Sequence, residues 1–121
     1  PFAGPEFMKK VIDRVVELMP SSKFPYDFLV IGHIDNYYKA NETQKANSLL
    51  KDYAYFTIDN LKYYFSLKEN FADVVSYDKE LNLQVLQELV SLAENYGQTD
   101  IYAEIEPILN DYFMQYIKTQ Q

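Results

Sequence analysis

The apolar residues of this chain recur every three to four positions along most of its length, which is the spacing of an amphipathic α-helix. No segment alternates apolar and polar residues for long enough to form a β-strand. We therefore predict an all-α fold built from antiparallel helical hairpins. The predicted helices cover residues 8–19, 26–39, 41–65 and 78–96, and a last helix runs from residue 99 or 100 to at least residue 117.

Residues with poor helix propensity mark the breaks between these helices. Pro20, followed by two serines, ends the first helix. Residues 66–76 are predicted to form a short helical turn followed by a loop. The third helix is expected to bend near residues 57–60, where β-branched and cap-prone residues weaken a helix. Pro107 either kinks the last helix or begins a fresh one.

Two short segments have the composition of a turn between antiparallel helices. In residues 37–46, Asn41 occupies a left-handed or capping position with Gln44 three residues later, and Ala46 is small enough for close helix contact. Gly97 is a common helix terminator, and Ala103 follows it. Such hinges are typical of tetratricopeptide repeats, whose period is about 34 residues. Because residues 66–76 interrupt that period, we predict a degenerate tetratricopeptide-like repeat bundle.

One apolar stripe on each predicted helix defines the expected core. The positions on these stripes are Phe28, Ile31, Ile34 or Asp35, and Tyr38; Ala46, Leu49, Leu50, Tyr53, Phe56, Leu61, Tyr64 and Phe65; Leu81, Val85, Leu86, Leu89, Leu92 and Ala93; and Ile101, Ile105, Ile108, Leu109, Tyr112, Phe113, Tyr116 and Ile117.

Composition narrows the classes of function. The 121 residues are 48% hydrophobic and carry a net charge of −7, which favours a folded domain and argues against nucleic acid as a partner. There is no cysteine, and no run approaches the roughly 20 apolar residues of a membrane span. We interpret residues 1–7 as an expression remnant and residues 8–121 as a single soluble helical-repeat domain.

Few residues in the chain are suited to catalysis. His33 is the only histidine and falls within an apolar helix, which is typical of a packed or capping side chain, so a two-histidine metal site is impossible here. Asp100, Glu104 and Glu106 cluster, but they fall on a predicted solvent face. There is no glycine-rich phosphate loop. We predict no catalytic residue, no metal site and no cofactor, and therefore no enzymatic activity for this chain.

The 12 tyrosines are the most unusual feature of the composition. Most are expected to fill gaps between helices, and Tyr38, Tyr55 and Tyr63 are the best candidates for exposed rings that contact a partner. If the repeat geometry holds, one concave face combines polar and aromatic side chains that suit a protein or peptide partner. The predicted partner-binding residues on that face are Asp35, Tyr38, Lys39, Gln87, Ser91 and Asn95.

Several local motifs, taken as a set, carry a family resemblance. They are Asp13-Arg14, Glu17-Leu18-Met19-Pro20, Phe24-Pro25-Tyr26-Asp27, Tyr37-Tyr38-Lys39-Ala40-Asn41-Glu42, Lys45-Ala46-Asn47, Tyr63-Tyr64-Phe65-Ser66-Leu67 and Leu92-Ala93-Glu94-Asn95-Tyr96-Gly97. From residue 8 onward, the chain resembles the C-terminal tail of a family of large bacterial multi-spanning membrane proteins of unknown function. The membrane part of that family is similar to protein O-mannosyltransferase-type glycosyltransferases, which use lipid-linked sugars. This chain has Asn41 where a turn glycine is usual in the family.

The resemblance implies that the chain is the soluble tail of a membrane protein, on the periplasmic side, and that the catalytic acids lie in a membrane part that is absent here. Its role would be to dock a protein, a peptide or the membrane domain of its own parent, without inserting into the membrane. Two alternatives remain open: a free-standing cytoplasmic adaptor that binds a peptide or protein through the concave face, and a small carbohydrate-acting enzyme that uses Glu104 or Glu106.

Overall fold

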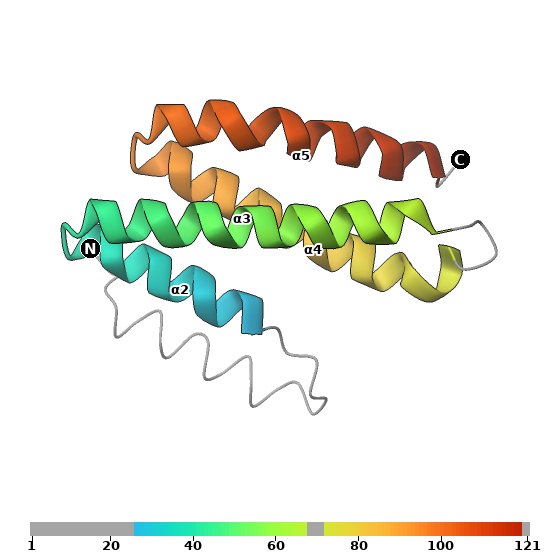
Figure 1. The fold of residues 1–121 in the computed structure, drawn as a ribbon, viewed down its shortest axis with the longest axis horizontal. Coiled ribbons are helices and arrows are strands. Elements are labelled where there is room, and N and C mark those ends of the chain that lie inside the picture. Colours follow the sequence, from blue (N-terminus) through green and yellow to red (C-terminus); the bar gives the residue numbers. More distant parts are fainter. Residues whose placement is uncertain (1–25, 68–71, 120–121) are drawn as a thin grey trace. The chain divides into compact units, whose positions relative to one another are not determined.

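The computed structural model of the protein describes residues 26–67 and 72–119, and this part of the chain is helical throughout apart from its turns. The helices are α2 (Tyr26–Lys39), α3 (Thr43–Ser66), α4 (Ala72–Asn95) and α5 (Thr99–Thr119), as Figure 1 shows. No strand occurs in the described ranges, so the predicted all-α fold is confirmed. The predicted helix 8–19 and residues 1–7 lie outside the described residues.

Backbone contacts divide the chain into two compact units, Pro1–Leu50 and Lys51–Gln121, and α3 contributes residues to both. In the first unit, α2 and the beginning of α3 form an antiparallel hairpin. The bounds of α2 are those predicted from its periodicity. Its buried stripe contains both Ile34 and Asp35, together with Val30, Ile31 and Tyr38.

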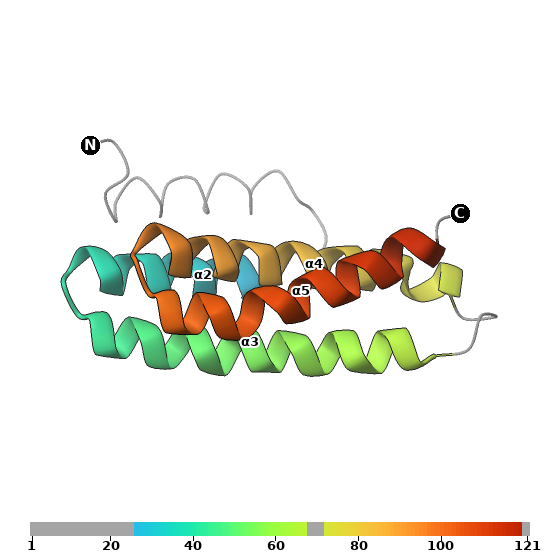
Figure 2. The ribbon, with the colours of Figure 1, turned by 90° about the horizontal axis from the view of Figure 1, so that it is seen from above.

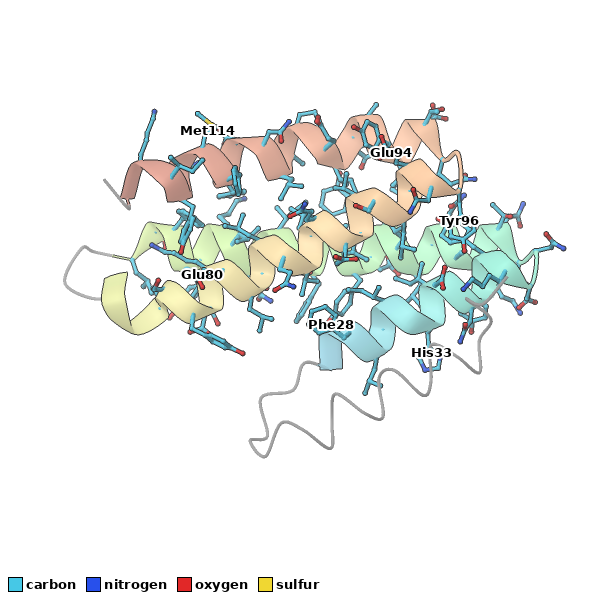
Figure 3. All side chains as sticks on the ribbon, turned by 180° about the vertical axis from the view of Figure 1, so that it is seen from behind. Phe28, His33, Glu80, Glu94, Tyr96 and Met114 are labelled. Atoms are coloured by element: carbon cyan, nitrogen blue, oxygen red, sulfur yellow. The ribbon has the colours of Figure 1, made fainter. Side chains whose placement is uncertain are left out.

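His33 is exposed and lies off this stripe, and its imidazole points away from α2 (Figure 3). The interpretation of His33 as a packed side chain is therefore wrong. With 100° between successive residues, position 33 falls outside the arc that is set by residues 30, 31, 34 and 38.

The turns that follow α2 and α4 have the same backbone geometry. Asn41 and Gly97 both adopt the left-handed conformation, with φ of 63° and 71°. After α2, the amides of Asn41 and Glu42 donate to the carbonyls of Tyr38 and Tyr37 at 3.0 and 2.9 Å. These are the paired bonds of a Schellman motif, and they satisfy carbonyl groups that the end of a helix leaves open.

The turn after α4 repeats these bonds. The amides of Gly97 and Gln98 donate to the carbonyls of Glu94 and Ala93 at 3.1 and 2.8 Å. Both predicted hinges are thus turns, but Asn41 caps the end of α2 and not the start of α3. Glu42 holds the capping position of α3, because its carbonyl accepts the first helical bond, from Ala46.

In the second unit, the latter part of α3 packs with α4 and α5, and each helix runs antiparallel to the one before it in sequence (Figure 2). Asn60 of α3 donates to Asn82 Oδ1 of α4 at 3.2 Å, and the Phe65 and Tyr112 rings of α3 and α5 lie 5.4 Å apart. Lys79 of α4 is buried, with its amine 4.6 Å from the centre of the Phe65 ring. The core is formed by the buried apolar residues Ala54, Ile58, Leu61, Val75, Leu83, Val85, Leu86, Leu89, Val90, Ala93, Ile101, Ile105 and Leu109.

The predicted start of α4 is wrong, because the helix begins at Ala72 and so includes much of the segment predicted as a turn and loop. The buried positions Val75, Lys79 and Asn82 continue the helical spacing of Leu86 and Leu89 toward the N-terminus. Two of these positions are polar, so a search for apolar residues placed the start of the stripe too far along the chain. The Asn82 amide is satisfied locally, since it donates to the Asp78 carbonyl at 2.8 Å.

The helical backbone continues through the positions that were expected to weaken α3 and α5. α3 is uninterrupted over residues 57–60, where the Thr57 hydroxyl donates to the Tyr53 carbonyl at 2.8 Å within the helix. α5 also continues through Pro107, which excludes a fresh helix there, and it changes direction along its length in Figure 2. Ala103 is exposed, so it does not repeat the close packing of the fully buried Ala46.

Candidate functional site

A groove of about 270 Å³ lies between α4 and α5 in the second unit. Its lining residues come from the C-terminal half of α4 and from most of α5: Gln87, Val90, Ser91, Glu94, Tyr102, Leu109, Asn110 and Phe113. Val90 and Leu109 are buried and form an apolar floor, whereas Gln87, Glu94 and Asn110 are exposed on the rim. The site thus has the apolar centre and polar edge of a binding surface.

Helical spacing explains why α4 presents these side chains. Gln87, Val90, Ser91 and Glu94 follow one another at the intervals of a single helix face. The fully buried Leu86 and Leu89 point to the core and fix the rotation of α4 about its own axis. The groove residues therefore occupy the face beside the core stripe.

Ile101, Ile105 and Leu109 are buried at intervals of four residues and fix the rotation of α5 about its own axis. Leu109 belongs both to this stripe and to the groove. Phe113, one turn farther along, leaves 48% of its surface exposed. An aromatic ring that lines a groove and remains half exposed is a typical anchor point for a partner.

The groove is electrostatically negative at the end nearest the α4–α5 turn. Figure 3 places Glu94 at this end and Met114 toward the far end of α5. The pKa of the Tyr102 hydroxyl is raised by partial desolvation and then by the negative charges of Glu94 and Glu106.

Two of the predicted partner-binding residues, Gln87 and Ser91, line this groove together. Asn95 is exposed on α4 but is not one of its lining residues. The remaining three, Asp35, Tyr38 and Lys39, belong to the first unit. There, Lys39 Nζ lies 2.8 Å from Asp35 Oδ2 in an ion pair one helical turn apart.

Tyr38 is only 5% exposed, so the expectation of an exposed Tyr38 ring is wrong. Its hydroxyl donates to Asn47 Oδ1 at 2.6 Å, and burial raises its pKa. This bond ties the end of α2 to the first turns of α3. Tyr55 and Tyr63 are exposed as expected, at 38% and 61%.

Sequence reasoning missed most of the groove. The residues it did not select are Val90, Glu94, Tyr102, Leu109, Asn110 and Phe113. Phe113 and Ile117 were assigned to the core stripe of the last helix, and Phe56 to that of α3. These three side chains are nevertheless 37% to 53% exposed. Ile101, Ile105 and Leu109 are buried as predicted, but a spacing of four residues drifts by about 40° per step around the helix, so Phe113, at the next step, lies at the edge of the stripe and stays half exposed.

Glu104, considered above as a catalytic acid, is held as a carboxylate. It accepts a hydrogen bond from the Tyr55 hydroxyl and lies 3.6 Å from Lys51 Nζ. The Tyr55 hydrogen bond is the main cause that lowers the Glu104 pKa, partial desolvation opposes it, and the Lys51 charge adds to the lowering. A general acid needs a raised pKa, so the environment of Glu104 is of the wrong kind for that role. The other candidate, Glu106, accepts a hydrogen bond from Asn110 Nδ2 at 2.7 Å.

We expect Tyr55→Phe to raise the pKa of Glu104, because it removes the hydrogen bond that most favours the charged form. A lowered pKa in the folded state stabilises the fold above the unfolded-state pKa, and this contribution is lost as the pH falls through the folded-state value. Side-chain carboxyl ¹³C shifts followed against pH would measure the change.

Lys51→Gln should raise the Glu104 pKa by less. Tyr63→Phe, at an exposed tyrosine of α3, is the control and should leave the Glu104 pKa unchanged. An unchanged Glu104 pKa in Tyr55→Phe would show that the hydrogen bond is not formed in solution.

No protein-family model, curated protein or solved structure matches the chain. Within residues 26–67 and 72–119, none of the helices is both long enough and apolar enough to cross a lipid bilayer. The same ranges hold no group of three or more His, Asp or Glu side chains positioned to bind a metal ion.

Proposed function

We propose that the chain is a non-catalytic helical interaction module that docks a protein or peptide on the α4–α5 groove. The observation that carries this proposal is the combination, in one groove, of the apolar floor of Val90 and Leu109 with the half-exposed Phe113 ring. Removing the half-exposed Phe113 ring from water would stabilise a complex by about 1 kcal/mol, since burying a fully exposed large apolar side chain contributes about 1.5 to 3 kcal/mol. The polar rim supplies donors and acceptors for orientation.

The local sequence motifs extend this proposal to a parent protein. On their resemblance, we propose that the module is the periplasmic tail of a bacterial glycosyltransferase-like membrane protein and that its hairpins are degenerate tetratricopeptide-like repeats. The paired Schellman turns are consistent with repeated hairpins, although Asn41 and Gly97 lie 56 residues apart, farther than the period of about 34 residues. The reading frame upstream of residue 8 distinguishes a membrane-protein tail from a free-standing adaptor. About a dozen encoded apolar spans would support the tail, and their absence would support a free-standing adaptor.

Site-specific photo-crosslinking in the cells that express the protein tests the docking function. A benzophenone side chain introduced at Ser91 lies in the groove, whereas the same group at Asp52 lies at an exposed position on α3 outside it. We expect a light-dependent adduct with one discrete partner from Ser91 and none from Asp52. No adduct at either position, or equal adducts at both, would contradict a docking function for this groove.

A further inference from the structure

We propose that the α4–α5 groove binds a cationic amphipathic helix of a partner protein. This inference rests on the proposed docking function and names the chemistry of the partner. It follows from three features of the second unit: the exposed apolar anchor, the charge of the surrounding surface and the length of the groove.

The apolar anchor favours a helix over a flat or fully polar partner. Phe113 presents apolar surface between two antiparallel helices, beside the largely buried Leu109 and Val90. A third helix seated there would pack as in a helical bundle, with its own apolar stripe against the floor. Ile117, one turn beyond Phe113 on α5, is 37% exposed and would extend this contact.

The two helices that line the groove are acidic. Residues 84–117, which make up most of α4 and α5, contain six acidic side chains and no lysine, arginine or histidine. One of the six, Glu94, lines the groove, and Glu106 acts with it on the Tyr102 hydroxyl. A cationic partner is attracted to this surface and an anionic one is repelled. The same argument disfavours a second copy of the chain, whose matching groove would bring like charges together.

The groove also sets the length of its occupant. Its lining on α5 runs from Tyr102 to Phe113, about 16 Å at 1.5 Å per residue. A ligand helix of about three turns, or roughly 11 residues, covers this length. It requires apolar residues at the intervals of one helix face and lysine or arginine on the flanks of that stripe.

Three fluorescein-labelled peptides of about 14 residues test the inference by fluorescence anisotropy with the full chain at low salt. The first carries a leucine stripe at helical spacing with flanking lysines. The second has the same stripe with flanking glutamates, and the third has the lysine composition with the stripe scrambled. We expect the first peptide to bind at least about tenfold more tightly than the other two, with an affinity that falls as salt is added.

Variants of the chain locate the binding. Phe113→Ala should weaken binding of the lysine peptide about tenfold, and Glu94→Lys about fivefold. Phe56→Ala and Asp52→Lys are matched controls on exposed positions of α3 outside the groove, and each should change the affinity less than about twofold. Because both groove residues are exposed at least in part, the variants should retain the far-ultraviolet circular dichroism of the parent chain.

Equal or tighter binding of the glutamate peptide would overturn the cationic assignment, and so would an affinity that neither Phe113→Ala nor Glu94→Lys lowers. A dimer in sedimentation that Phe113→Ala dissociates would assign the groove to a second copy of the chain instead. If the lysine peptide fails to bind while Ser91 still crosslinks to one partner, the docking function stands and the partner chemistry is wrong. If both experiments fail, both proposals are rejected.

Discussion

Replacing Ile105 with alanine is expected to lower the free energy of unfolding by about 2 to 5 kcal/mol, as in other large-to-small changes in packed cores. Ile105 is fully buried at the centre of the α5 stripe. The substitution removes three carbon atoms from the core and leaves a cavity that helices of fixed backbone cannot fill. Urea denaturation followed by circular dichroism at 222 nm measures the change.

The matched control is Ile117→Ala on the same helix, where the side chain is 37% exposed. Fewer contacts are lost there and alanine is the better helix former, so the expected loss is less than about 1 kcal/mol. Equal losses from the two substitutions would mean that α5 is not oriented with Ile105 toward the core and Ile117 toward the surface.

The second large effect is expected for Leu89→Glu on α4. Leu89 is fully buried, and a glutamate of similar length would place a carboxylate in the core without a partner. An uncompensated buried charge costs several kcal/mol, which is comparable to the total stability of a small domain of about 5 to 15 kcal/mol. We therefore expect the helical signal of the second unit to be largely lost at neutral pH.

Gln84→Glu adds the same charge to an exposed position of the same helix and should leave the helical signal and the denaturation midpoint nearly unchanged. Thermal unfolding of the parent chain and the two variants would compare them directly. A Leu89→Glu chain as stable as the parent would contradict the buried position of α4 residue 89. A large loss in Gln84→Glu would show that net charge, and not burial, limits stability.

Local signals in the sequence were sufficient for much of the fold. The bounds of α2 were predicted correctly, because an apolar stripe is enclosed between Pro25 and a residue that tolerates positive φ, Asn41. Gly97 likewise marked the end of α4 within one residue. The start of α4 was missed because the core positions that join Val75 to Leu86 are the polar residues Lys79 and Asn82. Only contacts with α3 reveal that these two side chains belong to the core stripe.

The groove was harder to predict than the helices. Gln87 and Ser91 were selected because they share one helix face, which is a local property of the chain. The α5 side was not found, since it depends on how α5 is rotated against α4. That rotation is set by which of several apolar positions enter the core: Ile101 and Ile105 do, whereas Phe113 remains half exposed. Tyr38 is buried on the α2 stripe where its spacing placed it, so counting its ring also among the exposed ones was the error.

The most direct test of the α4–α5 groove as the docking face is a ¹H–¹⁵N correlation titration of the full chain with the lysine-flanked amphipathic peptide. We expect amide shifts to change within residues 87–94 and 102–113, and the amides of residues 51–66 on α3 to stay unperturbed. Shift changes centred on α3, or no changes at peptide concentrations well above that of the chain, would contradict this expectation.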